Sequence, residues 1–369
     1  MTLDLPYRLV QISGMANNEY VSVLATEYLE YAVRDLDKAS PMYEKMGFTC
    51  VGYRTEPTRR SKLYMQGDIK IVLTASSSEK DAAFQFSRAH GDGVLTVGYR
   101  VENASEALSL ATRKGAQAVH DVQILKGLND STQHLGAIQV YGDVRNSFIS
   151  FEGRSRFEDF FAEEHKPVDT LKGRFLQTID HITINVEKGR MDHWAKFYED
   201  LFEFKQIRYF DIRTERSGLL SRALRNDNGR VTMPFNEPTN DKSQIQEFID
   251  TFHGAGVQHV AFHTSNIMLC LDELIKKDFK FLSVPDTYYE AIPKRVPNVV
   301  EDMRELSRLG ILVDGSPNGY LLQIFTQPLI GPFFFEFIQR KGDNGFGDGN
   351  FRALFEAIER DQIRRGVLS

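Results

Sequence analysis

The sequence predicts an α+β protein made of two similar halves, each built from repeated β-α-β-β-β units. Three observations predict this class. Short segments in which apolar and polar residues alternate, as half-buried strands require, are interrupted by a few helix-like segments. The order of these segments in the first half returns from residue 179 onward. The letters repeat as well, because GVLTVGYRVEN at 93–103 resembles GVQHVAFHTSN at 256–266.

The first half opens with an alternating segment, YLEYAV at 28–33, which predicts a strand. The helix-like segment 36–47 follows and ends at its glycine, and a second helix is predicted at 105–116. Further strands are predicted at 48–54, 62–75, 93–101, 137–144 and 147–153.

The second half repeats this order. A strand at 179–186 precedes a helix at 191–204, and strands follow to about 235. The remaining predicted elements are a strand at 256–264, a helix at 269–278 and strands at 320–326 and 333–340. The segment 154–174 is highly charged and contains a proline, as expected of a linker. We therefore predict a first domain at 1–153, a linker at 154–174 and a second domain at 175–369.

The C-terminal segment predicts one more helix. Apolar residues recur there at i, i+3, i+4 and i+7, which places them on one face of a helix that ends before Gly366. These residues are Phe351, Leu354, Phe355 and Ile358. Asn350 is a suitable N-cap, and the glycines at 345, 347 and 349 predict a flexible connection before it.

Composition excludes several classes of function. Of the 369 residues, 41% are hydrophobic and 26% are charged, and the net charge of −6 comes without a basic tract, so nucleic acid is not an expected partner. No apolar stretch reaches the 18 residues that a membrane-spanning helix needs, and no secretory signal precedes the first strand. The two cysteines, Cys50 and Cys270, lie far apart and form no ligand motif. We expect a cytoplasmic protein that is not bound to a membrane.

One acid stands in an unusual setting. Glu336 lies within FFFEFIQR at 333–340, so aromatic residues occupy both of its sides. An unpaired carboxylate buried among aromatic rings is costly. Either a paired arginine such as Arg340 or a bound cation would explain why the acid is there.

The duplication provides an internal comparison. His181 aligns with Tyr28 and His259 with Thr96, so the first half keeps the scaffold but lacks both histidines. Glu336 has no secure counterpart in the first half. The nearest acid there, Glu152, aligns with it only if the last strand is shifted.

Each of these histidines alone is more often a hydrogen-bonded structural residue than a ligand. Two imidazoles and one carboxylate on strand-like segments, however, form the ligand set that leaves three positions open on an octahedral metal and suits iron(II). The other histidines of the second half have structural explanations. His263, four residues from His259, would lie about 13 Å further along the same strand. His193 is on a predicted helix, and His253 precedes the strand.

Several segments of the second half resemble the 4-hydroxyphenylpyruvate dioxygenase family. They are DHITINV, NEPTNDKSQIQEF, GAGVQHVAFHTSNI, GYLLQIFTQP, FFEFIQR and GFGDGNFRALFEAIERDQIRRGVL. The first half is similar more weakly, through RRSKLYMQGDIKIVLTA and HGDGV. The resemblance implies the vicinal oxygen chelate fold, with the duplicated modules forming two open-barrel domains and a helix at the C-terminus.

The resemblance also implies residue roles. One iron(II) per chain would be held by His181, His259 and Glu336. The implied substrate-binding residues are Ser221, Pro234, Asn236, Gln244, Gln258, Gln323, Phe325, Phe334 and Phe346. The C-terminal helix would form a lid over the substrate with Asn350, Phe351 and Leu354.

The implied reaction converts 4-hydroxyphenylpyruvate and O2 to homogentisate and CO2, a step of tyrosine and phenylalanine catabolism, in a homodimer or homotetramer. The related 4-hydroxymandelate synthase, which oxidises the benzylic carbon of the same substrate, is the alternative enzyme. Pro234 and Phe346 favour the dioxygenase. A non-catalytic binding module is a third alternative, but it would be expected to have lost a ligand, as the first half has.

Overall fold

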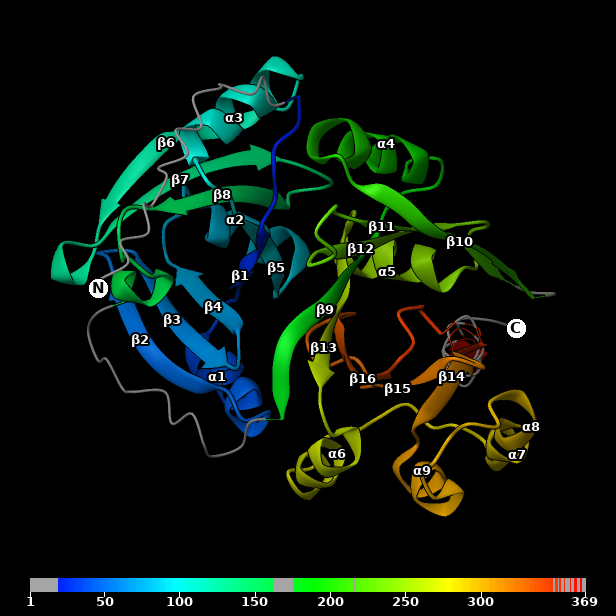
Figure 1. Cartoon of the computed structure of the whole chain (residues 1–369). Coiled ribbons are helices and arrows are strands. Elements are labelled where there is room, and N and C mark those ends of the chain that lie inside the picture. The colour runs from blue at the N-terminus through cyan, green and yellow to red at the C-terminus, as the bar shows by residue number, and fades with distance from the viewer. Residues whose placement is uncertain are drawn as a thin grey trace, which may run out of the picture.

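Two curled eight-stranded sheets lie side by side in the computed structural model (Figure 1). It describes residues 19–161, 175–214 and 217–347, followed by Gly349, Asn350, Arg352, Phe355, Glu359, Gln362, Ile363 and Gly366. The first sheet contains β1 (Ala25–Ala32), β2 (Thr49–Thr55), β3 (Arg59–Gln66), β4 (Ile69–Ser76), β5 (Gly93–Arg100), β6 (Ala118–Lys126), β7 (Thr132–Gln139) and β8 (Arg145–Phe151). The second contains β9 (Leu176–Asn185), β10 (Lys205–Arg213), β11 (Gly218–Arg225), β12 (Thr232–Pro238), β13 (Gly256–Thr264), β14 (Leu312–Ser316), β15 (Gly319–Phe325) and β16 (Phe334–Lys341).

The two sheets have one topology. Their strand orders are β2-β3-β4-β1-β5-β8-β7-β6 and β10-β11-β12-β9-β13-β16-β15-β14. In each sheet the central strand, β1 or β9, pairs in parallel with one neighbour and antiparallel with the other. Each half therefore consists of two β-α-β-β-β units, and the predicted duplication is confirmed.

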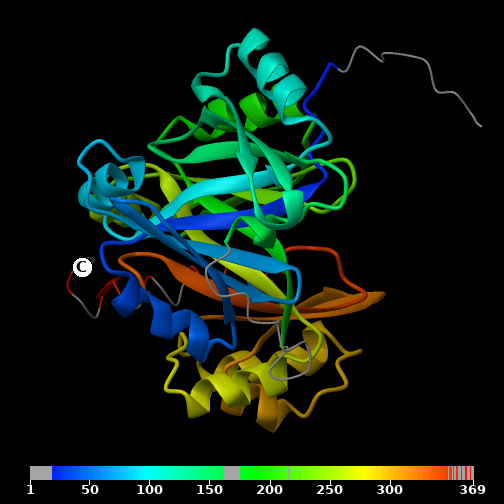
Figure 2. The ribbon, with the colours of Figure 1, turned by 90° about the vertical axis from the view of Figure 1, so that its left-hand side faces the viewer.

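The predicted helices α1 (Leu36–Lys45), α3 (Ala104–Arg113), α4 (Met191–Phe202) and α6 (Ile267–Lys276) are present. The sequence analysis missed α2 (Ala82–His90) and α5 (Gln244–Phe252), which connect the two units of each half. It also missed α7 (Asp286–Glu290), α8 (Ile292–Arg295) and α9 (Met303–Leu309). These three helices have 5, 4 and 7 residues, too few to establish a helical period. Figure 2 shows the segment from α6 to α9 gathered at one end of the molecule, remote from α3.

Each sheet has one face in a common core and one face toward a separate interior. Side chains alternate along a strand, so Tyr31 packs edge-on to Phe333 of the second half, with 5.5 Å between ring centroids. Tyr28, which also lies on β1, points to the other face of the sheet. It belongs to a small apolar cluster formed by the first half alone. In the second half, Phe325 and Phe334 form the corresponding inner cluster with Leu312. The inner faces of the two sheets therefore line separate interiors, while their outer faces share one core.

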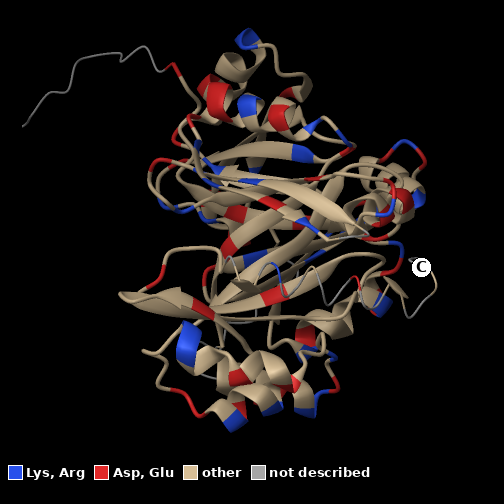
Figure 3. Cartoon of the chain, turned by 90° about the vertical axis from the view of Figure 1, so that its right-hand side faces the viewer, with Lys and Arg blue, Asp and Glu red and all other residues tan. Residues whose placement is uncertain are grey.

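The surface carries both signs of charge. Figure 3 shows acidic and basic residues interspersed over one side of the molecule. Among the described helices, none combines the length and the hydropathy needed to cross a bilayer. Cys50 and Cys270 are free thiols.

Candidate metal centre

Three adjacent strands bring His181, His259 and Glu336 together. The middle strand of the three, β13, pairs with β9 on one side and with β16 on the other. Ala261 of β13 faces His181 of β9 and also Glu336 of β16, which places the acid and this histidine on either side of it. His259 lies two residues before Ala261, and alternation turns its side chain to the same face.

The three side chains point one atom each toward a common position. Glu336 Oε2 lies 3.1 Å from His181 Nε2 and 3.4 Å from His259 Nε2. Two metal–ligand bonds of about 2.1 Å that meet at a right angle end about 3.0 Å apart, so this spacing fits three neighbouring positions of an octahedral metal. All three residues are buried, and in the described part of the chain they form the one group of this kind.

Neighbouring groups fix the orientation of His181. Its Nδ1 donates to Asp180 Oδ1 at 2.9 Å, which turns Nε2 toward Glu336. Asp180 in turn accepts two hydrogen bonds from Arg340, from Nε at 2.7 Å and from a terminal nitrogen at 2.8 Å. The hypothesis that Arg340 pairs with Glu336 is therefore wrong, because its guanidinium forms a bidentate pair with Asp180 instead.

His259 and Glu336 are oriented by amides. His259 Nδ1 donates to Gln258 Oε1 at 3.0 Å, which leaves its Nε2 free to bind a metal. Gln323 Nε2 donates to Glu336 Oε1 at 2.8 Å, which leaves Oε2 for the two histidines. Gln258 thus orients the imidazole of a candidate ligand, and its predicted contact with substrate stays a prediction.

The charges of the three residues are coupled. Burial raises the pKa of Glu336, but His181 and His259 outweigh it and lower the pKa to about 2. Burial lowers the pKa of His181, but the charge of Glu336 and the hydrogen bond to Asp180 outweigh it and raise the pKa to about 9. Burial lowers the pKa of His259. The group without metal is therefore an ion pair of Glu336 and His181, and a metal would take the place of the His181 Nε2 proton.

A chain of hydrogen bonds connects Glu336 to the surface. An ionised carboxylate can only accept, so Gln323 turns its NH2 group to Glu336 and its carbonyl to Asn350. The Asn350 amide is hydrogen-bonded to Gln323 Oε1 at 2.9 Å and to Tyr288 Oη at 2.7 Å. Arg295 donates to Tyr288 Oη at 2.8 Å. The chain thus runs from Arg295 through Tyr288, Asn350 and Gln323 to the carboxylate.

Gly347 permits the close approach of this chain to the C-terminal segment. Its φ is +67°, and a Cβ at this position would lie 2.5 Å from Gln323 Oε1. Asn350 was predicted to be an N-cap, which is wrong, because Gly349 before it is already helical. Its amide instead joins the segment to β15 through Gln323.

Aromatic rings surround the histidines. The His259 ring stacks on Phe334, with centroids 4.7 Å apart and an angle of 19°. Phe346 packs edge-on to His181 at 5.5 Å, and Phe325 packs edge-on to His259 at 6.2 Å. Aromatic rings therefore enclose much of the space around the three candidate ligand atoms.

The predicted substrate residues fall into three sets. Ser221, Pro234, Gln323, Phe325 and Phe346 line a cavity of about 20 Å³ together with the three candidate ligands. Gln244, Gln258 and Phe334 line a neighbouring cavity of about 350 Å³. Asn236 is buried beside the first cavity and pairs with Ser221 across β11 and β12. The predicted lid residues Phe351 and Leu354 lie outside the described residues.

Several buried polar atoms in this region have no partner within the described residues. They are Ser221 Oγ, Asn236 Oδ1, Gln244 Oε1 and Asn185 Nδ2. Buried polar groups are normally hydrogen-bonded, so unpaired ones beside a cavity are the groups that a polar ligand would satisfy. Sequence reasoning missed Asn185, and it also missed Phe210 and Thr183, which line the 20 Å³ cavity. Alternation along β9 carried a usable signal, since Thr183 and Asn185 follow His181 at every second position.

Comparisons with known proteins agree with this geometry. Residues 18–149 match the family model for hydroxyphenylpyruvate dioxygenase, HPPD, N-terminal, and residues 178–291 match that of the glyoxalase/bleomycin resistance protein/dioxygenase superfamily. The 4-hydroxyphenylpyruvate dioxygenase of Legionella pneumophila (strain Corby) is 40% identical over 357 residues, which cover 96% of this chain and 99% of that protein. The enzyme of the same name from Pseudomonas aeruginosa is 40% identical over 358 residues, 93% of this chain and 95% of that protein.

A mutant of 4-hydroxymandelate synthase from Streptomyces coelicolor has a similar structure. The TM-score is 0.81 at 24% sequence identity, and the match covers 93% of this chain and 99% of that one. At this identity the likeness concerns the fold alone. With the glyoxalase match, it confirms the predicted vicinal oxygen chelate fold.

Proposed function

The chain belongs to the 4-hydroxyphenylpyruvate dioxygenase family, and we propose that it converts 4-hydroxyphenylpyruvate and O2 to homogentisate and CO2 with one iron(II) per chain. The observation that carries the proposal is the buried convergence of His181 Nε2, His259 Nε2 and Glu336 Oε2. Two neutral imidazoles and one carboxylate on adjacent positions are the donor set that suits non-haem iron(II) oxygenases.

Iron(II) bound there would supply a Lewis-acid centre with open positions for a chelating 2-oxo acid and dioxygen. The protein supplies orientation and charge. Asp180 and Gln258 hold the two Nδ1 protons, so that both Nε2 atoms face the metal position. Gln323 occupies Glu336 Oε1, so that the carboxylate offers one oxygen. The surrounding rings of Phe325, Phe334 and Phe346 keep water away from the reacting carbon atoms.

The unpaired polar atoms support one orientation of the substrate. A phenol hydroxyl can both donate and accept, and Ser221 Oγ, Asn236 Oδ1 and Gln244 Oε1 are buried without partners among the described residues. We place the hydroxyl of 4-hydroxyphenylpyruvate among these groups and its 2-oxo acid end at the metal. The flat ring would then lie between the phenylalanines.

The 20 Å³ cavity is too small for an aromatic acid, so substrate entry requires movement. Phe346, a wall residue of this cavity, lies within the glycine-rich segment that follows β16. Arg340 holds this segment through the carbonyl of Gly345 at 2.7 Å, and Asn350 holds it through Gln323. The proposed lid would therefore open by releasing Asn350 while Arg340 stays bound to Asp180.

The two alternatives are weaker. The synthase likeness rests on fold, whereas the dioxygenase relatives share 40% of their residues with this chain over nearly its whole length. A binding module without catalysis would not need a complete ligand set whose histidine orientations are fixed. The proposed reaction places the enzyme in tyrosine catabolism; cytoplasmic location and a homodimer or homotetramer stay predictions.

Reconstitution of the purified protein tests the proposal. Iron(II) is titrated under anaerobic conditions, 4-hydroxyphenylpyruvate and air are added, and the aromatic product is identified. We expect homogentisate as the main product. Homogentisate and 4-hydroxymandelate are isomers, so retention time or NMR has to separate them, because mass alone does not. Mainly 4-hydroxymandelate would establish the synthase, and iron binding with no product would establish the binding module.

A further inference from the structure

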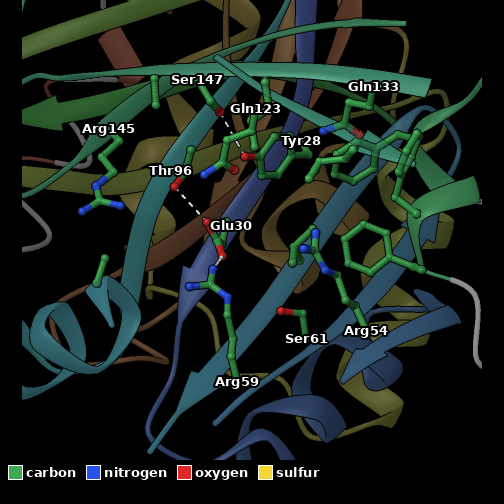
Figure 4. A pocket seen from close by; sticks show the side chains of 18 of the residues that line it. Tyr28, Glu30, Arg54, Arg59, Ser61, Thr96, Gln123, Gln133, Arg145 and Ser147 are labelled. Carbon is green, nitrogen blue, oxygen red and sulfur yellow. Dashed lines mark hydrogen bonds and ion pairs between the residues drawn. The ribbon is translucent and has the colours of Figure 1, made fainter. Parts of the chain in front are cut away.

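The inner face of the first sheet encloses a second, larger cavity of about 390 Å³ (Figure 4). All eight strands of that sheet contribute wall residues, among them Tyr28, Glu30, Thr96 and Arg145. Its volume lies within the range of about 300–1,000 Å³ that small-molecule sites occupy. The reaction proposed above does not use this cavity.

The cavity occupies the same position in its sheet as the metal centre does in the other. Tyr28 pairs with Gly98, which pairs with Ser147, as His181 pairs with Ala261 and Ala261 with Glu336. Tyr28 Oη and Ser147 Oγ are hydrogen-bonded at 3.0 Å, where His181 and Glu336 face each other at 3.1 Å. Ser147 is therefore the counterpart of Glu336. Glu152, which aligned with Glu336 only if the last strand was shifted, lies beyond β8 and pairs with His134.

The side chains that line this cavity do not suit a cation. Tyr28 and Ser147 offer hydroxyls that bind each other, and the charge of Glu30 is already paired with Arg59. The Glu30 carboxylate accepts from Arg59 and from Thr96 at 2.9 Å (Figure 4), and from Thr74 at 2.8 Å. Among the described residues, no group of three potential metal ligands forms in this cavity.

Two wall groups lack partners within the described residues. Arg145 Nε is buried and donates to no acceptor, and Gln133 Oε1 is buried and accepts from no donor. Gln133 is 4% exposed. Figure 4 places them on opposite sides of the cavity, with Tyr28 between them. Arginine can only donate, so a ligand needs an acceptor at one end and a donor at the other.

The other two arginines of the wall are already paired. Arg59 binds Glu30 and also Asp81, at 3.0 Å. Arg54 binds Glu56 at 2.8 Å. Arg145 is therefore the wall arginine with no ion pair in the described part of the chain. A carboxylate matches its planar donor geometry best.

The middle of the cavity suits an aromatic ring. Phe157, Phe160 and Phe161 line it, and Tyr28 stacks on Phe157 with centroids 4.7 Å apart. Phe157 follows Ser147 by ten residues, as Phe346 follows Glu336 by ten. Each domain thus packs one phenylalanine against an inward-facing residue, Tyr28 on β1 or His181 on β9. In the first domain a larger cavity remains beside this pair.

We infer that the first domain is a second binding site, free of metal, for a small hydroxyaryl carboxylic acid. Its carboxylate binds Arg145, its ring lies against the phenylalanines, and its hydroxyl donates to Gln133 Oε1. The substrate and the product of the proposed reaction belong to this chemical class, so the site would bind either one. The site itself is argued from the first domain alone and does not depend on the reaction.

The test measures binding of 4-hydroxyphenylacetate, which lacks the 2-oxo group and so cannot turn over. The iron-free full-length protein is titrated by calorimetry, as wild type and as two matched variants. Arg145→Leu removes the unpaired guanidinium, and Arg54→Leu removes a paired guanidinium from the wall of the same cavity. We expect Arg145→Leu to weaken binding at least tenfold and Arg54→Leu to change it less than threefold. Neither change should alter turnover at saturating 4-hydroxyphenylpyruvate.

A crystal structure of the complex locates the ligand. Density between Arg145 and Gln133 supports the inference, as does loss of binding with 4-ethylphenol, which has the ring and the hydroxyl but no acid. The inference is overturned if wild type does not bind 4-hydroxyphenylacetate at millimolar concentration, if Arg145→Leu binds as wild type does, or if density appears in the second domain alone. Because the assay requires neither iron nor turnover, its outcome is independent of that of the reconstitution.

Discussion

Gln323 donates a hydrogen bond to Glu336 at 2.8 Å and thereby selects which carboxylate oxygen faces the two histidines. The same amide is hydrogen-bonded to Asn350, and Asn350 is hydrogen-bonded to Tyr288. Tyr288 Oη also accepts from the backbone N–H of Val313 at 2.7 Å. One continuous hydrogen-bond network thus connects Glu336, the C-terminal segment and α7. A change at α7 should therefore affect the metal centre.

Tyr288→Phe should lower both stability and activity. The change removes the hydroxyl that the Asn350 amide and the Val313 N–H bind, which costs about 1–3 kcal/mol of unfolding free energy. We expect kcat to fall about tenfold while the metal stays bound, because the ligands are intact. Tyr289→Phe is the matched control, since its hydroxyl is buried without a partner in the described residues. That variant should unfold and turn over like wild type; equal losses in both would show that the network has no role in catalysis.

His181→Ala, His259→Ala and Glu336→Ala should each abolish turnover and reduce bound iron, measured by metal analysis after anaerobic reconstitution. Each change removes one of three convergent donor atoms, and no neighbouring group replaces it. Far-UV circular dichroism should stay unchanged. His263→Ala serves as the control, because His263 lies on the same strand but outside the ligand group. Wild-type activity in any of the three variants would remove that residue from the centre.

Asp180→Ala should weaken iron binding about 10–100-fold, as expected when the partner that orients a ligating imidazole is lost. The structural reason is that His181 Nδ1 loses its acceptor and Arg340 loses its bidentate partner. Asp180→Asn keeps one acceptor oxygen and should lose less. Iron affinity is read from competition with a chelator. If alanine and asparagine at this position behave alike, and both like wild type, Asp180 does not orient the ligand.

Truncation after Gly345 tests the lid. All three candidate ligands and the Arg340 contact to the Gly345 carbonyl precede the cut, whereas Phe346 and Asn350 are removed. We expect iron to bind and homogentisate to fall steeply relative to the oxygen consumed, because water reaches the site. An oxygen electrode and product analysis on the same sample give the ratio. Normal coupling in the truncated protein would reduce the segment to a packing element.

Glu301→Gln should destabilise the protein at neutral pH and matter less in acid. Burial raises the pKa of Glu301, but its contacts with Lys341 and Tyr320 outweigh it and hold the pKa below its ordinary value. A lowered pKa contributes stability above the unfolded-state pKa of about 4.3, and this contribution is lost as the pH falls. We expect a difference of about 1–2 kcal/mol in urea unfolding at pH 7 that shrinks toward pH 3. Glu305→Gln, on an exposed pair with Arg308, should show a small difference at both pH values.

The sequence by itself determined the repeated strand pattern, the helices α1, α3, α4 and α6, and the candidate ligands. Alternation along 28–33 and 179–186 fixes which side chains share a face, because the pleat is a local property of the chain. The repeated segment order fixes the duplication. His181, His259 and Glu336 were recognisable from residue type, from their absence in the first half and from family resemblance. None of these inferences needs a contact between distant residues.

The tertiary structure alone decided which distant groups meet. Asp180 and Arg340 are 160 residues apart, and no local pattern links them. The roles of Tyr288 and Asn350 depend on how α7 packs against β14 and the C-terminal segment. The assignment of Ser147 to the place of Glu336 required the strand register, since a shift of one residue turns a side chain to the other face. Only the tertiary structure shows that Arg145 and Gln133 lack partners, because the other wall residues come from strands that are distant in the sequence.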